Sequence, residues 1–392
     1  MNNHAHVLDG FSEQFLKFIE LYVNATDLKP YVTGTAQPKM NQAKMNGIPV
    51  ALPPEAEQVR IVAKVDELMA LCSRLEAEQR EREARRDRLV AVSLNPLNNG
   101  ANAQTLQASS RFYLDHLPRL TTSLVHIQQL RQAILNLAVR GQLVPQKPTD
   151  EPASVLLRRI QAEKTRLTGE GKIKGDRELP PPIKEEDAPF SIPSGWQWER
   201  FIGVAAIQSN LVNPSKYEDS PHIAPDNIES GTGRLLPYTT VRASAVFSAK
   251  HLFFSGCILY SKIRPALAKA VLADFDGLCS ADMYPILPFI SREYLHKYML
   301  SEAFVRQSIS EDNRVAMPKI NQAALAKIIV PVPPLAEQLR IVAKVGELMA
   351  LCDRLESQLT TAKEQSSRLL ESVLHNALAD IHAESIKVTA QA

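Results

Sequence analysis

The residues with the clearest chemical signature lie between Ser230 and Ala273. This stretch of 44 residues contains no Asp or Glu, although the chain has 43 acidic residues in total. The net charge of the whole chain is only +2, so the positive charge of this stretch is a local feature. Clustered Lys and Arg side chains are typical of surfaces that bind nucleic-acid phosphates. The six basic residues of the stretch are Arg234, Arg242, Lys250, Lys262, Arg264 and Lys269.

Aromatic residues are interleaved with these cations, and they leave two interpretations open. In the first, the segment is one face of a DNA-binding module. In the second, the aromatic side chains form the core of a sheet and the cations lie on its solvated face. Composition alone does not separate the two. The aromatic residues are Tyr238, Phe247, Phe253, Phe254 and Tyr260.

A second candidate segment, NRVAMPKINQ, covers residues 313–322. It is polar, basic and loop-like. Arg and Asn side chains can make paired hydrogen bonds to base edges, and Lys can contact phosphates. We therefore add Arg314, Lys319 and Asn321 to the candidate DNA-binding residues. The alternative is that this segment is only the turn before the last strand and the final helix.

The chain lacks the common catalytic motifs. It has no P-loop, no G-x-S-x-G elbow and no H-E-x-x-H pair. The segment NPSKY at residues 213–217 is faintly similar to the Asn-Pro-Pro-Tyr signature of adenine methyltransferases, but it lacks the second proline, and we interpret it as an Asn-Pro turn. No metal-binding spacing occurs among Cys72, Cys257, Cys279 and Cys352. We therefore predict no catalytic, cofactor-binding or metal-binding residues.

A helix that occurs twice must position these candidates. Residues 53–76 and 333–356 are identical at 20 of 24 positions, at an offset of 280. Each copy begins with two prolines, which suit the first turn of a helix. Apolar residues then recur at spacings of three and four, which predicts one apolar stripe. In the first copy the stripe includes Val65, Leu68, Cys72 and Leu75, and in the second Val345, Leu348, Cys352 and Leu355.

Neither long helix is expected to be stable alone. Without proline until about Ser93 and Ala379, and with Gly346 as the one glycine of the second run, each would extend for roughly 60 Å at about 1.5 Å per residue. A helix with one narrow apolar stripe requires a partner helix. The obvious partner is the other copy. The alternative is two unrelated surface helices.

The repeat and the shifts in composition predict six segments. Residues 36–42 and 316–322 also match at the same offset, so the chain start resembles the end of a domain that is complete only in the second half. The segments are a domain remnant (1–52), a long helix (53–95), a helical connector with a Pro/Gly-rich charged linker (96–189), a complete domain (190–332), a second long helix (333–380) and a tail (381–392).

The complete domain is predicted to be of the α+β class. Turn signals separate strand-like runs at 241–247, 252–254, 257–261 and 328–332, and one helix is expected at 292–308. Upstream, residues 96–110 read as a polar linker, a helix ends at Gly141, and another begins at Asp150 to Pro152. An aromatic helix is expected at 15–23.

Targeting signals are not apparent in the sequence. The first residues lack a basic segment followed by an apolar run, and no stretch of 18 apolar residues occurs. The cysteine pattern is typical of a reducing compartment. We expect a cytoplasmic protein without a membrane partner.

Together these motifs resemble the specificity (S) subunits of type I restriction-modification systems. The resemblance covers nearly the whole chain. It is carried by the two long-helix copies, by LRQAILNLAVRGQLVPQKPTDEPASVLLRRI (130–160), by FSIPSGWQWER (190–200), by GCILYSKIRPALAKAVLADFDGLCSADMYPI and by AMPKINQAALAKIIVPVPP.

The resemblance implies a fold and a set of partners. It implies an α+β fold, in which a mixed α/β target-recognition domain is attached to two long helices that form an antiparallel coiled coil. The helices would separate the two halves of a split DNA site by roughly 17 base pairs at 3.4 Å each. It further implies a subunit without catalytic activity, whose partners are double-stranded DNA, methyltransferase (M) subunits and a restriction (R) subunit. S-adenosylmethionine, ATP and Mg would be bound by those partner subunits.

The chain departs from the family pattern in having one complete recognition domain and a remnant. It should then read one half-site, and two chains paired through the long helices would read a palindromic split site. The alternative is a coiled-coil scaffold that binds M subunits without useful sequence readout, as in a decayed specificity subunit. By the resemblance, Lys262, Arg264, Lys319 and Asn321 are the strongest DNA-contact candidates.

Overall fold

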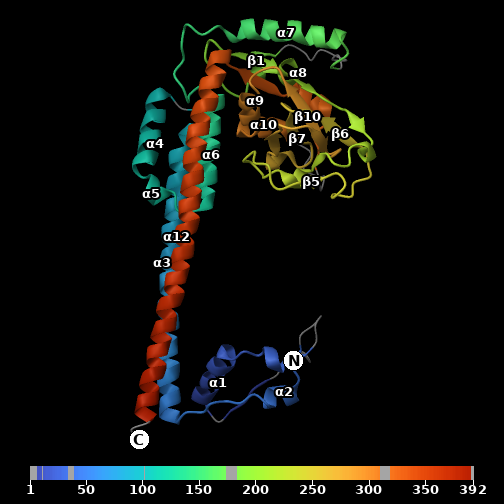
Figure 1. The fold of residues 1–392 in the computed structure, drawn as a ribbon. Helices are drawn as coiled ribbons and strands as arrows, with labels where there is room; N and C mark the ends of the chain where they lie inside the picture. The colour runs from blue at the N-terminus through green and yellow to red at the C-terminus, as the bar shows by residue number, and fades with distance from the viewer. Residues whose placement is uncertain are drawn as a thin grey trace. The chain divides into compact units, whose positions relative to one another are not determined.

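The computed structural model describes residues 7–10, 12–33, 39–100, 102–173, 183–309 and 318–389. The chain divides into two compact units, residues 1–86 and residues 87–392. Figure 1 shows the helices and strands of both units.

The first unit is mostly helical. Helix α1 (Glu13–Ala25) contains the predicted aromatic helix and begins at Ser12, whose hydroxyl accepts a hydrogen bond from the amide of Phe15. A 3-10 turn (Lys29–Tyr31) and the short helix α2 (Gln42–Asn46) follow. The hydroxyl of Tyr22 donates to the carbonyl of Pro49, 2.9 Å away, and links α1 to the segment before the first long helix.

The first long helix, α3, spans Glu55–Asn99 and crosses into the second unit. It begins directly after the paired prolines, as predicted. The predicted end near residue 95 was wrong, because the helix continues through Pro96. The cost of a proline inside a helix is offset here by burial, since Val90, Leu94 and Leu97 pack in a small core on either side of it.

The predicted linker at 96–110 was also wrong. It contains the end of α3 and most of helix α4 (Ala103–Asp115), which begins at Asn102. A short helix, α5 (Leu117–Leu120), follows. Tyr113 of α4 and Leu120 of α5 complete the core around Leu94. The segment is mostly polar, so its sequence did not indicate that a few apolar side chains pack it into a core.

Two further helices form the rest of the connector. Helix α6 (Leu124–Val139) ends before Gly141, which has φ +71°, a left-handed conformation that suits glycine after a helix. Helix α7 (Ala153–Gly169) follows. The sequence predicts that this helix begins at Asp150 to Pro152. The carboxylate of Asp150 instead binds Arg340, and Pro152 takes the cap position without a side-chain hydrogen bond.

Residues 197–332 form the mixed domain that the sequence predicts, and their described part contains three small sheets. The strand orders are β1-β11, β2-β10-β7-β8 and β3-β6-β9-β4-β5. The strands are β1 (Gln197–Arg200), β2 (Ala205–Ile207), β3 (Leu211–Val212), β4 (Pro221–Ile223), β5 (Thr239–Thr240), β6 (Lys250–Phe253), β7 (Ile258–Ser261), β8 (Ala270–Leu272), β9 (Gly277–Cys279), β10 (Met283–Pro288) and β11 (Ile329–Val332).

Three of the four predicted strands are present, as β6, β7 and β11. The run at 241–247 is not a strand, because the chain turns there and Ala245 has φ +49°. The predicted helix at 292–308 is two helices, α9 (Arg292–Met299) and α10 (Glu302–Ser308), and Ser301 occupies the position before the second without a side-chain capping hydrogen bond. The remaining helices are α8 (Phe201–Val204) and α11 (Gln322–Lys327).

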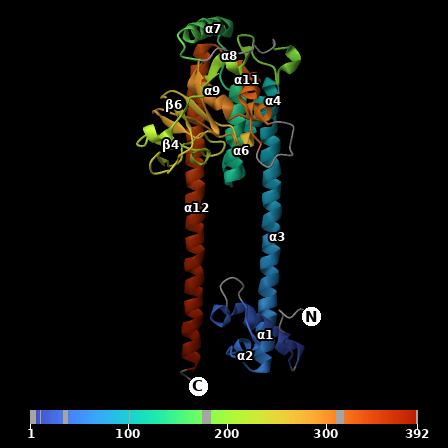
Figure 2. The ribbon, with the colours of Figure 1, turned by 90° about the vertical axis from the view of Figure 1, so that its right-hand side faces the viewer.

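The second long helix, α12, spans Leu335–Thr389. Its apolar stripe packs in the main core, where Val345 and Cys352 lie with Ile127 and Ile134 of α6. Figures 1 and 2 show α6 lying along the first half of α12. The stripe of the second copy is therefore covered by α6 and the recognition domain, and not only by the other long helix as the sequence predicts. Pairing of the two long helices with each other stays a prediction.

Candidate nucleic-acid interface

Four of the predicted DNA-contact residues meet around one β-bridge. Ile263 pairs with Lys319 across this bridge. The amide of Arg264 donates to the carbonyl of Pro318, and the amide of Ile320 donates to the carbonyl of Lys262, both at 2.9 Å. The bridge thus brings together two segments that are more than 50 residues apart in the sequence. We call Lys262, Arg264, Lys319 and Asn321 the bridge cluster.

Arg264 is the most available cation of the bridge cluster. Its side chain is exposed and makes no ion pair or side-chain hydrogen bond with any residue that the structure describes. Its backbone is left-handed, with φ 48° and ψ 59°, and Ala268 at the other end of the short turn has φ 46°. Such conformations cost a non-glycine residue on the order of 1 kcal/mol and occur often at functional sites. The bridge to Pro318 holds this strained turn in place.

The two lysines of the bridge cluster share one carboxylate. Asp282 lies 3.2 Å from the ammonium of Lys319 and 3.7 Å from that of Lys262. Lys262 also donates to the carbonyl of Ala281 at 2.6 Å and lies over the ring of Tyr284. Three cations against one carboxylate leave the cluster positive. Asp282 is not among the predicted residues, because it lies beyond the acid-free stretch that ends at Ala273.

Asn321 has a structural role that the sequence left open. It caps helix α11, and its side-chain oxygen accepts from the amide of Ala324 at 2.8 Å. Asn41, the matching residue of the first copy, caps α2 in the same way through the amide of Lys44, at 2.9 Å. The repeated Asn therefore begins a short helix in both units. Contact with a base is not needed to explain its presence.

The other predicted cations are engaged by acids from outside the basic stretch. Arg234 lies 2.8 Å from Glu229 and 3.7 Å from Glu356. Arg242 lies 3.1 Å from both Glu218 and Asp219.

Two further lysines of the basic stretch point into the protein. Lys269 donates to the carbonyl of Pro225 at 2.7 Å and lies 3.8 Å from Asp226. Lys250 is buried, and its ammonium binds the carbonyl and hydroxyl of Ser248. Arg314 lies outside the described residues.

Two histidines near these lysines are held neutral. Burial, and secondarily the ammonium of Lys250, lowers the pKa of His222 below its ordinary value. Burial and the ammonium of Lys262 lower the pKa of His251 in the same way. Neutral imidazoles add no positive charge to the surface at pH 7.

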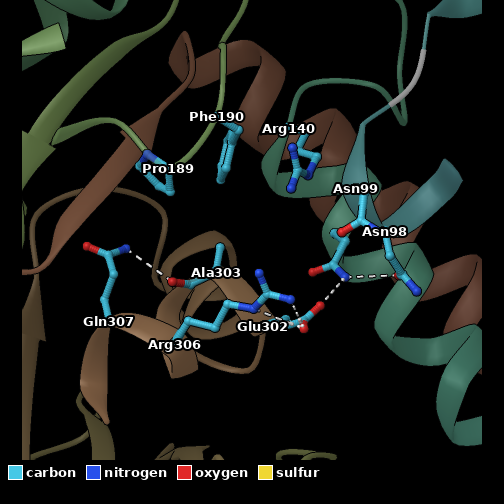
Figure 3. A pocket seen from close by; sticks show the side chains of 10 residues that line it. Asn98, Asn99, Arg140, Pro189, Phe190, Glu302, Ala303, Arg306 and Gln307 are labelled. Atoms are coloured by element: carbon cyan, nitrogen blue, oxygen red, sulfur yellow. Dashed lines mark hydrogen bonds and ion pairs between the residues drawn. The ribbon is translucent and has the colours of Figure 1, made fainter. Parts of the chain in front are cut away.

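A cavity of about 190 Å³ lies elsewhere, between α6, α10 and the end of α3. Figure 3 shows its lining, in which Asn136 donates to Asn98 and to Glu302. Arg306 pairs with Glu302 at 2.6 Å, and the guanidinium of Arg140 lies 4.4 Å from the ring centre of Phe190. Burial, and then the charge of Arg306, lowers the pKa of Arg140. None of the predicted site residues lines this cavity.

Comparison with known proteins assigns this chain to a class. A family model described as the type I restriction modification DNA specificity domain matches residues 1–85 and 196–364. The matches cover more than half of the chain, which therefore belongs to this family. Each matched region ends within one of the two long helices. No helix among the described residues is long and apolar enough to span a membrane.

Individual relatives agree with this assignment. The chain is 34% identical over 346 residues to the type I restriction enzyme EcoDI specificity subunit of Escherichia coli, covering 88% of this chain and 64% of that protein. It is 29% identical over 369 residues to the EcoAI specificity subunit of the same organism, covering 88% and 61%. The chain thus spans less than two thirds of these relatives.

The chain is less similar to the solved structures than to these relatives. One belongs to a study of complex assembly and conformational transition of the type I R-M system, with a TM-score of 0.46 at 17% identity, covering 90% of this chain and 66% of that one. Another is the HsdS subunit from Thermoanaerobacter tengcongensis, with a TM-score of 0.35 at 17% identity, covering 88% and 64%.

Proposed function

We propose that this chain is a DNA-reading specificity subunit whose single complete recognition domain contacts one half of a split target. The observation that carries the proposal is the bridge cluster. It presents a guanidinium that has no ion-pair partner among the described residues, on a turn held by a β-bridge, beside two lysines that share one carboxylate. An Arg in such a position can pair with guanine edges or with phosphates.

We further propose that the chain acts with protein partners and catalyses no reaction itself. The chain would bind methyltransferase subunits that methylate adenine, and the complex would recruit a restriction subunit. S-adenosylmethionine, ATP and Mg²⁺ would be bound by those partners. Relatives described as specificity subunits of type I restriction enzymes support this assignment.

The first test is DNA binding by the chain with its M partner, measured across a series of salt concentrations. We expect Arg264→Ala and Lys319→Ala each to weaken binding several-fold. Each should also reduce the slope of log affinity against log salt by about 1 if the lost contact is to phosphate. Arg242→Ala is the matched control, because Arg242 is already neutralised by Glu218 and Asp219. Equal effects of Arg242→Ala and Arg264→Ala would contradict the proposed surface.

Adenine methylation mapped in cells that express the chain with M tests the half-site reading. A palindromic split motif indicates two paired chains, and unlike halves indicate a second specificity chain. If M co-purifies but no adenine is methylated, and if the complex binds all DNA with equal affinity, the chain is a scaffold and not a DNA-reading subunit.

A further inference from the structure

The cavity shown in Figure 3 contains a cation that has no ion-pair partner within the described part of the chain. The guanidinium of Arg140, at the end of α6, lies 4.4 Å from the ring centre of Phe190 and makes no hydrogen bond with a described residue. The chain also passes close to it at Gly100, where an added Cβ would come within 2.9 Å of Nη1. A ring and a backbone segment therefore restrict the position of this guanidinium at the edge of an open space.

The charges of the cavity lining do not balance. Arg306 pairs with Glu302 at 2.6 Å, and Asn136 donates to the same carboxylate at 3.4 Å. Among the described lining residues, two guanidiniums and one carboxylate leave a net charge of +1. Burial, and then the charge of Arg306, lowers the pKa of Arg140, because both disfavour its charged form. An anion in the cavity would offset both effects.

Two amide side chains of the lining offer hydrogen-bond acceptors as well. The NH2 group of Asn99 donates to the side chain of Asn95. The NH2 group of Asn136 donates to Asn98 and to Glu302. The side-chain oxygens of Asn99 and Asn136 accept no hydrogen bond from a residue that the structure describes. A cation beside free acceptors suits a molecule that carries both an anionic group and a hydroxyl group.

The size and the charge of the cavity limit the class of ligand. Its volume of about 190 Å³ is below the roughly 300–1,000 Å³ of sites for drug-sized ligands. A phosphate group has a charge of about −1.5 to −2 at pH 7, which exceeds the net charge of the lining and would be repelled by Glu302. A carboxylate has a single charge, and its two oxygens match the paired N–H groups of an arginine.

We propose that this cavity binds a small hydroxycarboxylate. Its carboxylate would accept hydrogen bonds from Arg140, and its hydroxyl would donate to the amide oxygens of Asn99 and Asn136. The lining comes from the end of α3, from α6, from residues 189–190 and from α10 of the recognition domain. Because the site exists only in the folded chain, the ligand should stabilise residues 87–392 against unfolding.

Modification of arginine by phenylglyoxal tests the site in the full chain, and mass spectrometry identifies each modified residue. Saturating lactate should slow the modification of Arg140 about tenfold, because the bound carboxylate blocks the reagent. Arg119, which is exposed and lies outside the cavity, is the internal control and should react at the same rate with and without lactate. At equal ionic strength, propionate lacks the hydroxyl and should protect less, and lactamide lacks the charge and should not protect.

The midpoint of thermal unfolding provides a second measurement. Lactate should raise the midpoint of the unaltered chain, and Arg140→Gln should abolish this shift. Arg119→Gln is the matched control and should retain the shift, because Arg119 does not line the cavity. The phenylglyoxal experiment needs no variant, so it decides the proposal even if Arg140→Gln does not fold.

Four results would overturn the proposal. Equal modification of Arg140 with and without lactate would mean that the cavity binds no carboxylate. Equal protection by propionate and lactate would exclude the role of the amide oxygens. Stronger protection by inorganic phosphate would show that the charge of the lining does not select the ligand. A midpoint shift that persists in Arg140→Gln would place lactate elsewhere. None of these measurements involves DNA, so they do not depend on the proposed readout.

Discussion

The two copies of the long helix have nearly the same sequence and different surroundings. On α12, Val345 is fully buried in the main core with α6 and the recognition domain. On α3, Cys72 and most of the stripe are exposed. Local sequence dictated the helix in both cases. The stripe of the second copy is buried because a complete domain lies beside it. An apolar stripe in a sequence therefore identifies a surface that must be covered, but it does not identify the partner that covers it.

The largest expected difference between the copies comes from a buried charge. Val345→Asp should lower the free energy of unfolding of residues 87–392 by about 3 kcal/mol or more, because an unpaired carboxylate would be buried. Val65→Asp, at the matching half-buried position, should change the same transition by less than about 0.5 kcal/mol. Urea unfolding followed by tryptophan fluorescence measures this, because Trp196 and Trp198 both lie in the second unit. Equal losses would show that the two environments do not differ.

A smaller effect is expected where the copies differ in sequence. Arg131 of α6 lies 2.7 Å from Asp353 and 2.8 Å from Glu356, and its side chain is 10% exposed. Arg131→Ala should cost about 1–3 kcal/mol, since a guanidinium bonded to two carboxylates is lost.

Asp353→Ser, which installs the residue found at Ser73 in the first copy, should cost less than about 1 kcal/mol, because Asp353 is 57% exposed. A double-mutant cycle on the same fluorescence transition measures the coupling. Zero coupling would contradict an ion pair at this position.

The smallest effect is expected at Glu337, whose carboxyl group should make the stability of the second unit depend on pH. Burial raises the pKa of Glu337 above its ordinary value, and the hydrogen bonds from Trp196 and Gln146 only partly oppose this. The folded state therefore retains this proton to a higher pH than the unfolded state. The contribution of Glu337 to stability should be greatest at low pH and should fall as pH rises through the raised pKa.

Glu337→Gln should remove that decline, so its stability should change less than that of the unaltered chain between about pH 4 and pH 7. Unfolding midpoints across this range measure the slope. Glu57→Gln is the matched control and should leave the profile unchanged, because Glu57 is exposed. A steeper profile in Glu337→Gln would reverse the assigned sign.

The basic stretch offers a second comparison between sequence and structure. The window from 230 to 273 contains six cations and no acid, yet Arg234 and Arg242 are both paired. Their partners Glu229, Glu218 and Asp219 lie just before the window. A count of charge along the chain could not reveal these contacts, because ion pairs form in space. Arg264, in contrast, is exposed and has no ion-pair partner among the residues that the structure describes.

The sequence alone determined the repeated helix, the α+β class of the complete domain and the resemblance to specificity subunits, because these depend on local periodicity and on motifs that survive as strings. It also placed Lys262, Arg264, Lys319 and Asn321 among the candidates. The tertiary structure alone decided that a β-bridge joins these residues, that Asp282 offsets two of them, and that α6 covers α12. The physical reason is that burial and ion pairing depend on residues far apart in the sequence, whereas helix formation depends on near neighbours.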